Sequence, residues 1–223
     1  KKNCCNLIQL EHSVNKNEMY CDDYGYRSGL NNSMVEHLKR RIKKICKYVN
    51  LKNNDVVIDI GSNDGTSLSF YPQKIRKIGI DPTAKKFKNF YKKDIMLIDD
   101  FFSANLIKKK IGAEKAKVIS SFAMFYDLDE PLKFASEVAE ILDPKEGIWV
   151  LEQSYLPKMM EMISFDTICH EHLEYYSLIQ IQWIMERVGL KIIDVEFNNV
   201  NGGSIELDIA KKKSKYKECK DLI

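Results

Sequence analysis

Hydrophobic residues follow two different periods along the chain. Between Ser33 and Val49 they recur at every third or fourth position, which predicts an amphipathic helix with Ser33 as its N-cap. The run Asp55–Ile60 that follows is almost continuously apolar. Such a run is typical of a strand that is buried on both faces of a parallel sheet.

The same patterns predict six more strands and four more helices. The strands span residues 77–80, 95–98, 116–120, 147–152, 191–197 and 204–210. The helices span residues 83–91, 104–111, 130–142 and 179–188. Their alternation indicates βαβ units with right-handed crossovers, and the short gap between the last two strands indicates an antiparallel hairpin. We therefore expect an α/β fold with a seven-stranded, mostly parallel sheet.

Composition narrows the class of protein. With 223 residues, 44% of them hydrophobic, the chain is long enough to bury a full core. Its apolar runs are far shorter than the roughly 20 residues that cross a bilayer, and its net charge of +3 does not favour nucleic acid as a partner. The basic clusters at 39–44, 108–110 and 211–217 are expected on solvated surfaces. Six cysteines without a disulfide framework, and no secretory signal, favour a cytoplasmic location.

A glycine-rich turn follows the predicted strand that ends at residue 60. Gly61, Ser62, Asn63 and Gly65 lie in this turn, where glycines let a ligand approach bare backbone. Asp81 follows the next strand, about 20 residues after the first glycine, where a carboxylate can accept hydrogen bonds from both ribose hydroxyls. The turn lacks the second glycine that makes room for a pyrophosphate. We therefore expect an adenosyl ligand that carries an amino acid.

Side chains near the other strands are candidates for the remaining cofactor contacts. Asp99 or Asp100 could accept a hydrogen bond from the adenine amino group while Phe101 covers the ring. The alternative is that the acidic pair only caps the following helix. Phe122, after the strand at 116–120, and Tyr24 are further candidates.

Two loops combine glycines with functional side chains. The loop Tyr24–Gly29 contains two tyrosines and an arginine ahead of the first helix, and we expect it to form a lid over the cofactor. The sequence Asn201-Gly-Gly-Ser204 predicts a hairpin turn. A close approach of its glycines to a ligand is the alternative.

Titratable groups concentrate after the strand at 147–152, near the edge of the sheet where α/β proteins bind substrates. They are His170, Glu171, His172, Tyr175 and Tyr176. A histidine there can act as a base near neutral pH, and Glu171 can orient it or support its charge. The alternatives are a structural histidine bonded to a carbonyl, and a metal pair. No cysteine or aspartate at ligand spacing clearly joins the pair, so we expect no metal site.

Six motifs, taken together, carry a family likeness. They are Tyr24-Gly-Tyr-Arg-Ser-Gly29, Gly61-Ser-Asn-Asp-Gly65, Ile80-Asp-Pro-Thr83, Met124-Phe-Tyr-Asp127, His170-Glu-His-Leu-Glu-Tyr-Tyr176 and Asn201-Gly-Gly-Ser204. Through nearly its whole length the chain resembles the nucleotide-sugar C-methyltransferases of deoxysugar pathways. The resemblance implies a Rossmann-like class I fold that binds S-adenosylmethionine. Cys169 and Tyr126 depart from it, because some relatives carry a tyrosine and a histidine there.

The resemblance also implies a division of the chain. Residues 1–32 correspond to the end of a zinc-binding segment and the lid loop, residues 33–213 to the methyltransferase domain, and residues 214–223 to a tail towards a C-terminal domain. Cys4 and Cys5 match the zinc segment, but its other cysteines are not matched, so we expect no zinc in this chain. The expected partner is a small molecule, a nucleotide-linked sugar, and the oligomeric state stays open.

In the reaction that the resemblance implies, the carbon next to a keto group of the sugar is methylated. A base removes its proton, and a donor stabilises the enolate. We expect His172 as the base and Glu171 as its partner. Further candidates for acid, base or donor are His170, Tyr26, Tyr175 and Tyr176. Two alternatives stay open: O- or N-methylation of another small molecule, and a non-catalytic chain that only binds the cofactor.

Overall fold

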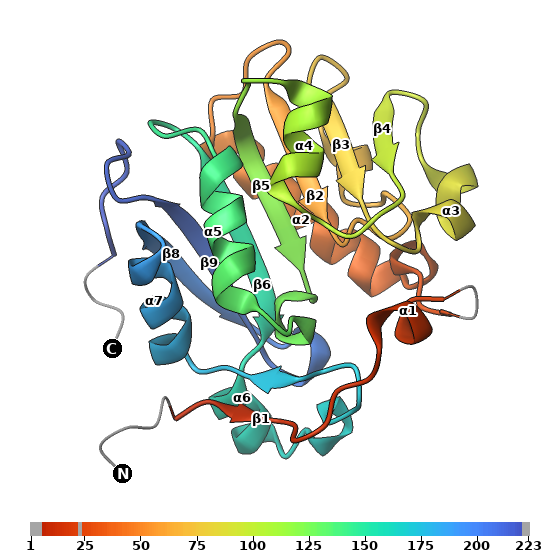
Figure 1. The fold of residues 1–223 in the computed structure, drawn as a ribbon, viewed down its shortest axis with the longest axis vertical. Coiled ribbons are helices and arrows are strands. Elements are labelled where there is room, and N and C mark those ends of the chain that lie inside the picture. The colour runs from red at the N-terminus through yellow and green to blue at the C-terminus, as the bar shows by residue number, and fades with distance from the viewer. Residues whose placement is uncertain (1–5, 22–23, 220–223) are drawn as a thin grey trace.

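The computed structural model describes residues 6–21 and 24–219 and has a seven-stranded sheet at its centre (Figure 1). The strands are β2 (Val56–Ile60), β3 (Arg76–Ile80), β4 (Ile95–Ile98), β5 (Ala116–Phe122), β6 (Ile148–Ser154), β8 (Leu190–Asn198) and β9 (Ser204–Lys211). They lie in the order β4-β3-β2-β5-β6-β9-β8. The first five are parallel, and β9 runs antiparallel to both its neighbours. The predicted fold class and the C-terminal hairpin are confirmed.

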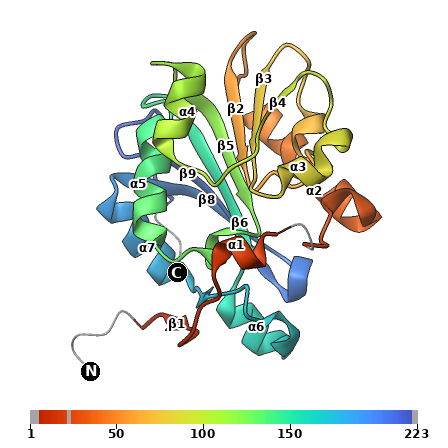
Figure 2. The same cartoon turned by 45° about the vertical axis from the view of Figure 1, so that its right-hand side comes forward.

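Helices cover both faces of the sheet (Figures 1 and 2). One face carries α4 (Ala104–Ile111), α5 (Pro131–Ile141) and α7 (Leu178–Arg187), and the other carries α2 (Asn32–Tyr48). Strand β2 contributes to both cores, because Ile58 packs with the first set of helices and Val57 packs with α2. This explains its continuous apolar run. Among the described residues, no helix has the length and apolar character to span a membrane.

Several short elements were not predicted from periodicity. Strand β1 (Ile8–Gln9) pairs antiparallel with β7 (Glu174–Tyr175). Helices α1 (Lys16–Met19) and α6 (Leu156–Met162) are also additional, and α3 (Ala84–Phe87) is shorter than the helix predicted at 83–91. Such short segments contain too few residues for a periodic signal. Figure 2 shows α1 at the carboxyl ends of the central strands, so the N-terminal segment crosses the functional edge of the sheet.

Two local predictions about α2 are corrected by the structure. Its N-cap is Asn31 rather than Ser33, because the Asn31 side chain accepts a hydrogen bond from the Ser33 backbone N–H at 3.0 Å. The basic cluster at 39–44 is not wholly solvated. Arg41 is 4% exposed and faces the sheet, where its guanidinium donates to Asp208 on β9 at 2.7 Å. The cluster of basic residues in the sequence therefore gave no indication that one of them forms a buried ion pair.

Candidate active site

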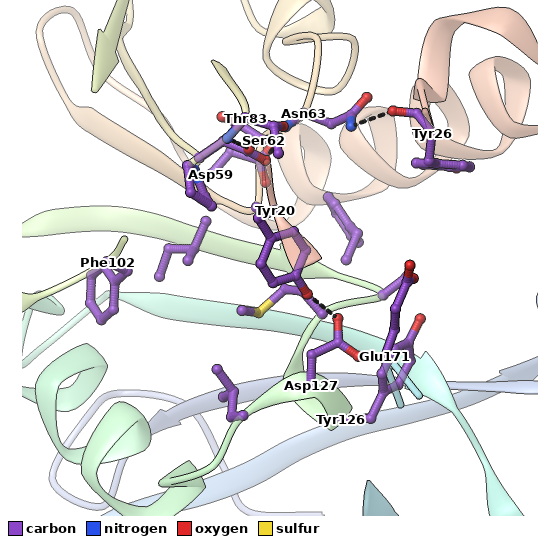
Figure 3. A pocket seen from close by; sticks show the side chains of 18 of the residues that line it. Tyr20, Tyr26, Asp59, Ser62, Asn63, Thr83, Phe102, Tyr126, Asp127 and Glu171 are labelled. Carbon is purple, nitrogen blue, oxygen red and sulfur yellow. Dashed lines mark hydrogen bonds between the residues drawn. The ribbon is translucent and has the colours of Figure 1, made fainter. Parts of the chain in front are cut away.

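A cavity of about 600 Å³ opens at the carboxyl ends of β2, β3 and β5 (Figure 3). This is the edge of the sheet where α/β proteins bind ligands, and the volume is typical of a small-molecule site. Its walls come from the glycine-rich turn, the N-terminal segment, the turn after β5 and the segment that contains the two histidines. The predicted site residues that line it are Tyr24, Tyr26, Gly61, Ser62, Asn63, Asp81, Phe101, Phe122, Glu171 and His172.

The glycine-rich turn has left-handed backbone at both of its glycines and at Asn63. Gly61 has a φ of +72°, and a Cβ at this position would lie 3.1 Å from Cγ of Met124. Glycine is therefore needed there both for the backbone conformation and for the close approach. Gly65 has a φ of +74°, and a Cβ there would lie 2.8 Å from the Tyr91 ring. Gly65 thus shapes the turn but does not itself line the cavity.

Two buried carboxylates stand beside this turn. Oδ2 of Asp81 accepts a hydrogen bond from the backbone N–H of Asn63 at 2.8 Å, and Oδ1 accepts from the backbone N–H of Thr83 at 2.7 Å. These bonds fix Asp81 at the place where the sequence predicts ribose hydroxyls. Asp59, on β2, accepts a hydrogen bond from the Ser120 hydroxyl at 2.5 Å. Burial raises the pKa of Asp59 to about 6.

Aromatic side chains form the wall of the cavity near β4 and β5. They are Phe101, Phe102 and Phe122. The acidic pair that precedes them does not line the cavity. Asp99 accepts a hydrogen bond from the backbone N–H of Lys85 at 3.3 Å, and Asp100 accepts one from the N–H of Phe101 at 2.7 Å. The N-cap of α4 is Ser103, so this pair neither lines the cavity nor caps the helix.

The loop of residues 24–29 is held against the glycine-rich turn. The backbone N–H of Ser28 donates to Oδ1 of Asn63 at 2.9 Å, and the N–H of Gly29 donates to Oδ2 of Asp64 at 2.9 Å. The residues of the loop that line the cavity are Tyr24, Tyr26 and Ser28. One short loop therefore contacts both the glycine-rich turn and the open part of the cavity.

His172 has a defined tautomer in the cavity wall. Its Nδ1 lies 2.7 Å from the backbone carbonyl oxygen of Thr167. Because a carbonyl only accepts hydrogen bonds, Nδ1 carries the proton and Nε2 keeps its lone pair. The imidazole lies against the Tyr126 ring, with 4.2 Å between the ring centroids. Burial lowers the pKa of His172, so the imidazole is neutral at physiological pH and can accept a proton.

The other predicted catalytic residues differ in whether they line the cavity. Glu171 lines the cavity, whereas His170 is exposed and does not. Tyr176 is completely buried, and its hydroxyl donates to Glu174. Tyr175 is buried as part of the strand that pairs with β1, and it does not line the main cavity. Tyr175 instead borders a small second pocket beside His172, and its hydroxyl has no hydrogen-bond partner among the described residues.

Tyr20 and Asp127 are among the cavity residues that the sequence analysis did not name as site residues. The Tyr20 hydroxyl donates to Oδ2 of Asp127 at 3.0 Å (Figure 3). Burial raises the pKa of both groups, that of Asp127 well above its usual range. Asp127 lies in a short helical turn after β5, so its place after a parallel strand was a usable signal. Tyr20 follows the four-residue helix α1, where the sequence carries no periodic pattern.

A second buried polar cluster lies between α2 and the sheet, outside the cavity. His37, Glu152 and Glu206 place possible metal ligand atoms within 4.8 Å of one another. However, Nε2 of His37 is hydrogen-bonded to Glu152 at 2.8 Å, and Nε of Arg41 lies 3.0 Å from a carboxylate oxygen of Glu206. Arg41 thus supplies the positive charge that a metal would bring to this buried ion network.

The glycine-rich turn, Asp81 and His172 therefore line one cavity. A protein-family profile described as a methyltransferase domain matches residues 34–195. The chain belongs to this methyltransferase family. In the methyltransferase, the matched residues extend from α2 to β8 and include the glycine-rich turn, Asp81, Asp127 and His172.

Individual relatives agree with this assignment. The C-methyltransferase NovU of Streptomyces niveus is 26% identical over 204 residues, which cover 90% of this chain and 48% of that protein. The methyltransferase chain thus spans about half the length of this curated relative. An S-adenosylmethionine-dependent methyltransferase from Clostridium acetobutylicum has a TM-score of 0.61 at 12% identity, with 79% of this chain and 92% of that one covered.

A further solved structure shares the fold. Magnesium protoporphyrin IX methyltransferase from Synechocystis PCC 6803, solved with bound SAH, has a TM-score of 0.59 at 11% identity, with 87% of this chain and 92% of that one covered. The fold is that of the class I S-adenosylmethionine-dependent methyltransferases, so S-adenosylmethionine is the cofactor that the fold implies. The site fits this cofactor, because Gly61 leaves bare backbone, Asp81 can bind ribose hydroxyls and the phenylalanines offer a flat apolar wall.

Proposed function

We propose that this methyltransferase adds a methyl group to the carbon next to the keto group of a nucleotide-linked deoxysugar. The observation that carries the proposal is His172, which presents an unprotonated Nε2 in the cavity wall. A carbon becomes nucleophilic only if its proton is removed, and this step needs a base. The 26% identity to C-methyltransferase NovU over 90% of the chain supports the same chemistry.

The cavity residues suggest how each step proceeds. Nε2 of His172 takes the proton from the carbon, the C–H electron pair forms the double bond of the enolate, and the ketone oxygen takes the negative charge. Glu171 favours the charged form of His172 and so stabilises the imidazolium. S-adenosylmethionine, held at the glycine-rich turn and Asp81, would supply the electrophilic methyl group that the enolate carbon takes up as the ketone is restored. His172 then releases its proton to solvent.

Among the three tyrosines predicted as enolate donors, Tyr26 is the one that lines the cavity. Its side chain is half exposed, and it belongs to the loop that is bonded to the glycine-rich turn. We therefore assign Tyr26 to substrate positioning.

The test is replacement of His172 together with a matched control. We expect His172→Ala to lower kcat by about 100-fold or more, the usual contribution of a general base. His12→Ala, an exposed histidine that does not line the cavity, is expected to keep the wild-type rate. The assay offers nucleotide-linked keto sugars with ¹³C-methyl cofactor, and carbon NMR locates the methyl group in the product.

The same assay separates the alternatives. A methyl group found on oxygen or nitrogen of the product would identify another class of small-molecule methyltransferase. S-adenosylhomocysteine binding in calorimetry without turnover on any acceptor would identify a chain that only binds the cofactor. If His172→Ala kept its rate within about tenfold of the wild type, His172 would not be the base.

A further inference from the structure

We propose that Asp127 is a second catalytic residue, which acts as a neutral carboxylic acid and donates a hydrogen bond from Oδ1 to the ketone oxygen of the substrate as the enolate forms. This inference rests on the proposed function and assigns the oxyanion donor of the same reaction. It adds a group from the turn after β5 to a mechanism that otherwise depends on the loop of residues 24–29 and on His172.

The two carboxyl oxygens of Asp127 have different surroundings. Oδ2 accepts the hydrogen bond from Tyr20 at 3.0 Å. Oδ1 is buried and has no hydrogen-bond partner among the described residues, although Asp127 lines the cavity. Figure 3 shows the side chain of Asp127 between Tyr20 and the side chains of Tyr126 and Glu171. A buried polar atom without a partner is costly, and at the wall of a ligand cavity a ligand can supply the missing partner.

The charges around Asp127 favour its neutral form. The titratable groups around it are Tyr20, Tyr24, Tyr126, Glu171, His172 and Tyr175. None of these side chains is a cation at neutral pH, and Glu171 adds a negative charge. The two lysines of the cavity wall face other acids, because Lys16 lies 2.8 Å from Asp129 and Lys133 lies 3.0 Å from Glu130.

A carboxylate that is buried without a cation has a raised pKa, and burial is the main cause of the raised pKa of Asp127. Because Oδ2 already accepts from Tyr20, the proton belongs on Oδ1, the oxygen without a partner. The arrangement therefore turns a carboxyl group into a hydrogen-bond donor. Such a donor stabilises negative charge on a ketone oxygen without giving up its proton.

The donor and the base are carried by neighbouring parts of the same wall. Asp127 directly follows Tyr126, and the Tyr126 ring lies against the His172 imidazole. As Nε2 of His172 removes the proton from carbon, the charge that develops on the ketone oxygen is met by the Oδ1 proton of Asp127. Only the proton on carbon is transferred, so the Asp127 proton stays in place through the cycle.

The first test replaces Asp127 in two ways. Asp127→Asn keeps an acceptor for Tyr20 and a donor for the substrate, whereas Asp127→Ala removes both. With a thymidine-diphosphate-linked 4-keto-6-deoxyglucose as the probe, Asp127→Ala is expected to lower kcat by about 100-fold, the usual loss for one oxyanion donor. Asp127→Asn is expected to stay within about tenfold of the wild type. The control Glu218→Gln changes an exposed carboxylate that does not line the cavity and is expected to keep the wild-type rate.

A second readout separates catalysis from a structural role. The wild-type kcat should fall as the pH rises through the raised pKa of Asp127, because only the neutral acid donates. Asp127→Asn, which cannot ionise, should lack this alkaline loss. The infrared difference spectrum between the wild type and Asp127→Asn, both loaded with S-adenosylhomocysteine at neutral pH, should show the band of a neutral carboxyl group.

Three results would overturn the inference. One is the absence of the neutral carboxyl band. Another is a kcat of Asp127→Ala within about threefold of the wild type, and the third is an alkaline loss that persists in Asp127→Asn. The proposed function fails differently: a wild type that shows the neutral band but neither methylates keto sugars nor exchanges their α-protons with deuterated water would overturn the carbon methylation, and the assignment of Asp127 with it.

Discussion

Gly61 decides how closely a ligand can approach the backbone at the end of strand β2. Its φ of +72° is in the left-handed region, and its missing Cβ leaves room for the Met124 side chain at the cavity wall. An alanine would meet two separate costs at this position. The backbone conformation alone costs roughly 1–2 kcal/mol for a residue with a Cβ, and the Met124 side chain, which lines the cavity, must also shift.

We expect Gly61→Ala to weaken S-adenosylhomocysteine binding by about tenfold or more, which corresponds to about 1.4 kcal/mol. Gly189→Ala is the matched control, because Gly189 has a φ of +76° but a Cβ there would meet nothing within 4 Å. Both variants should lose similar stability through the backbone, and only Gly61→Ala should lose affinity. Isothermal calorimetry and urea unfolding measure the two effects. Equal affinities in the two variants would show that the close approach at Gly61 does not matter.

The pH dependence of the reaction should also reflect single residues. His172 accepts a proton only when it is neutral, so kcat/KM is expected to fall as the pH drops through its pKa. Burial lowers that pKa, so this acid limb should lie below the usual value of about 6.5. A pH–rate profile of the wild type measures it. An acid limb at or above the usual histidine value would contradict the buried, neutral imidazole.

At the scale of elements, α2 is joined to the C-terminal hairpin by buried charge as well as by apolar side chains. Arg41 of α2 is 4% exposed and lies within 3.0 Å of carboxylate oxygens from both Glu206 and Asp208 on β9. Burial raises the pKa of Asp208 despite the nearby guanidinium. These acids therefore depend on Arg41 for compensation, and its loss would leave uncompensated carboxyl groups inside the fold.

Arg41→Met is expected to lower the free energy of unfolding by about 3–5 kcal/mol, because a buried charge loses its partner. Lys43→Met, an exposed change in the same helix, should stay within about 0.5 kcal/mol of the wild type. The measurement is urea unfolding at neutral pH. Adding Asp208→Asn to Arg41→Met should recover part of the loss. Equal stability of the two single variants would refute the role of the network.

At the scale of the whole molecule, the sequence was informative wherever a local pattern carried the signal. Periodicity located the seven strands of the central sheet, and spacing located Gly61, Asp81 and the segment around His172. The sequence could not predict the hydrogen bond between Tyr20 and Asp127, because the two residues are 107 positions apart and no sequence pattern accompanies the contact. It also assigned Tyr176 to the site, because a tyrosine in the core and one in a cavity wall look alike in sequence.

The loop of residues 24–29 has a consequence for the whole catalytic cycle. It is bonded to Asn63 and Asp64 of the glycine-rich turn, and its tyrosines face the open part of the cavity. If one ligand orders the loop, the other ligand binds next to a loop that is already ordered and does not pay that entropic cost again. Cofactor and acceptor should consequently show reciprocal cooperativity: each should tighten the binding of the other by the same factor, as thermodynamic linkage requires.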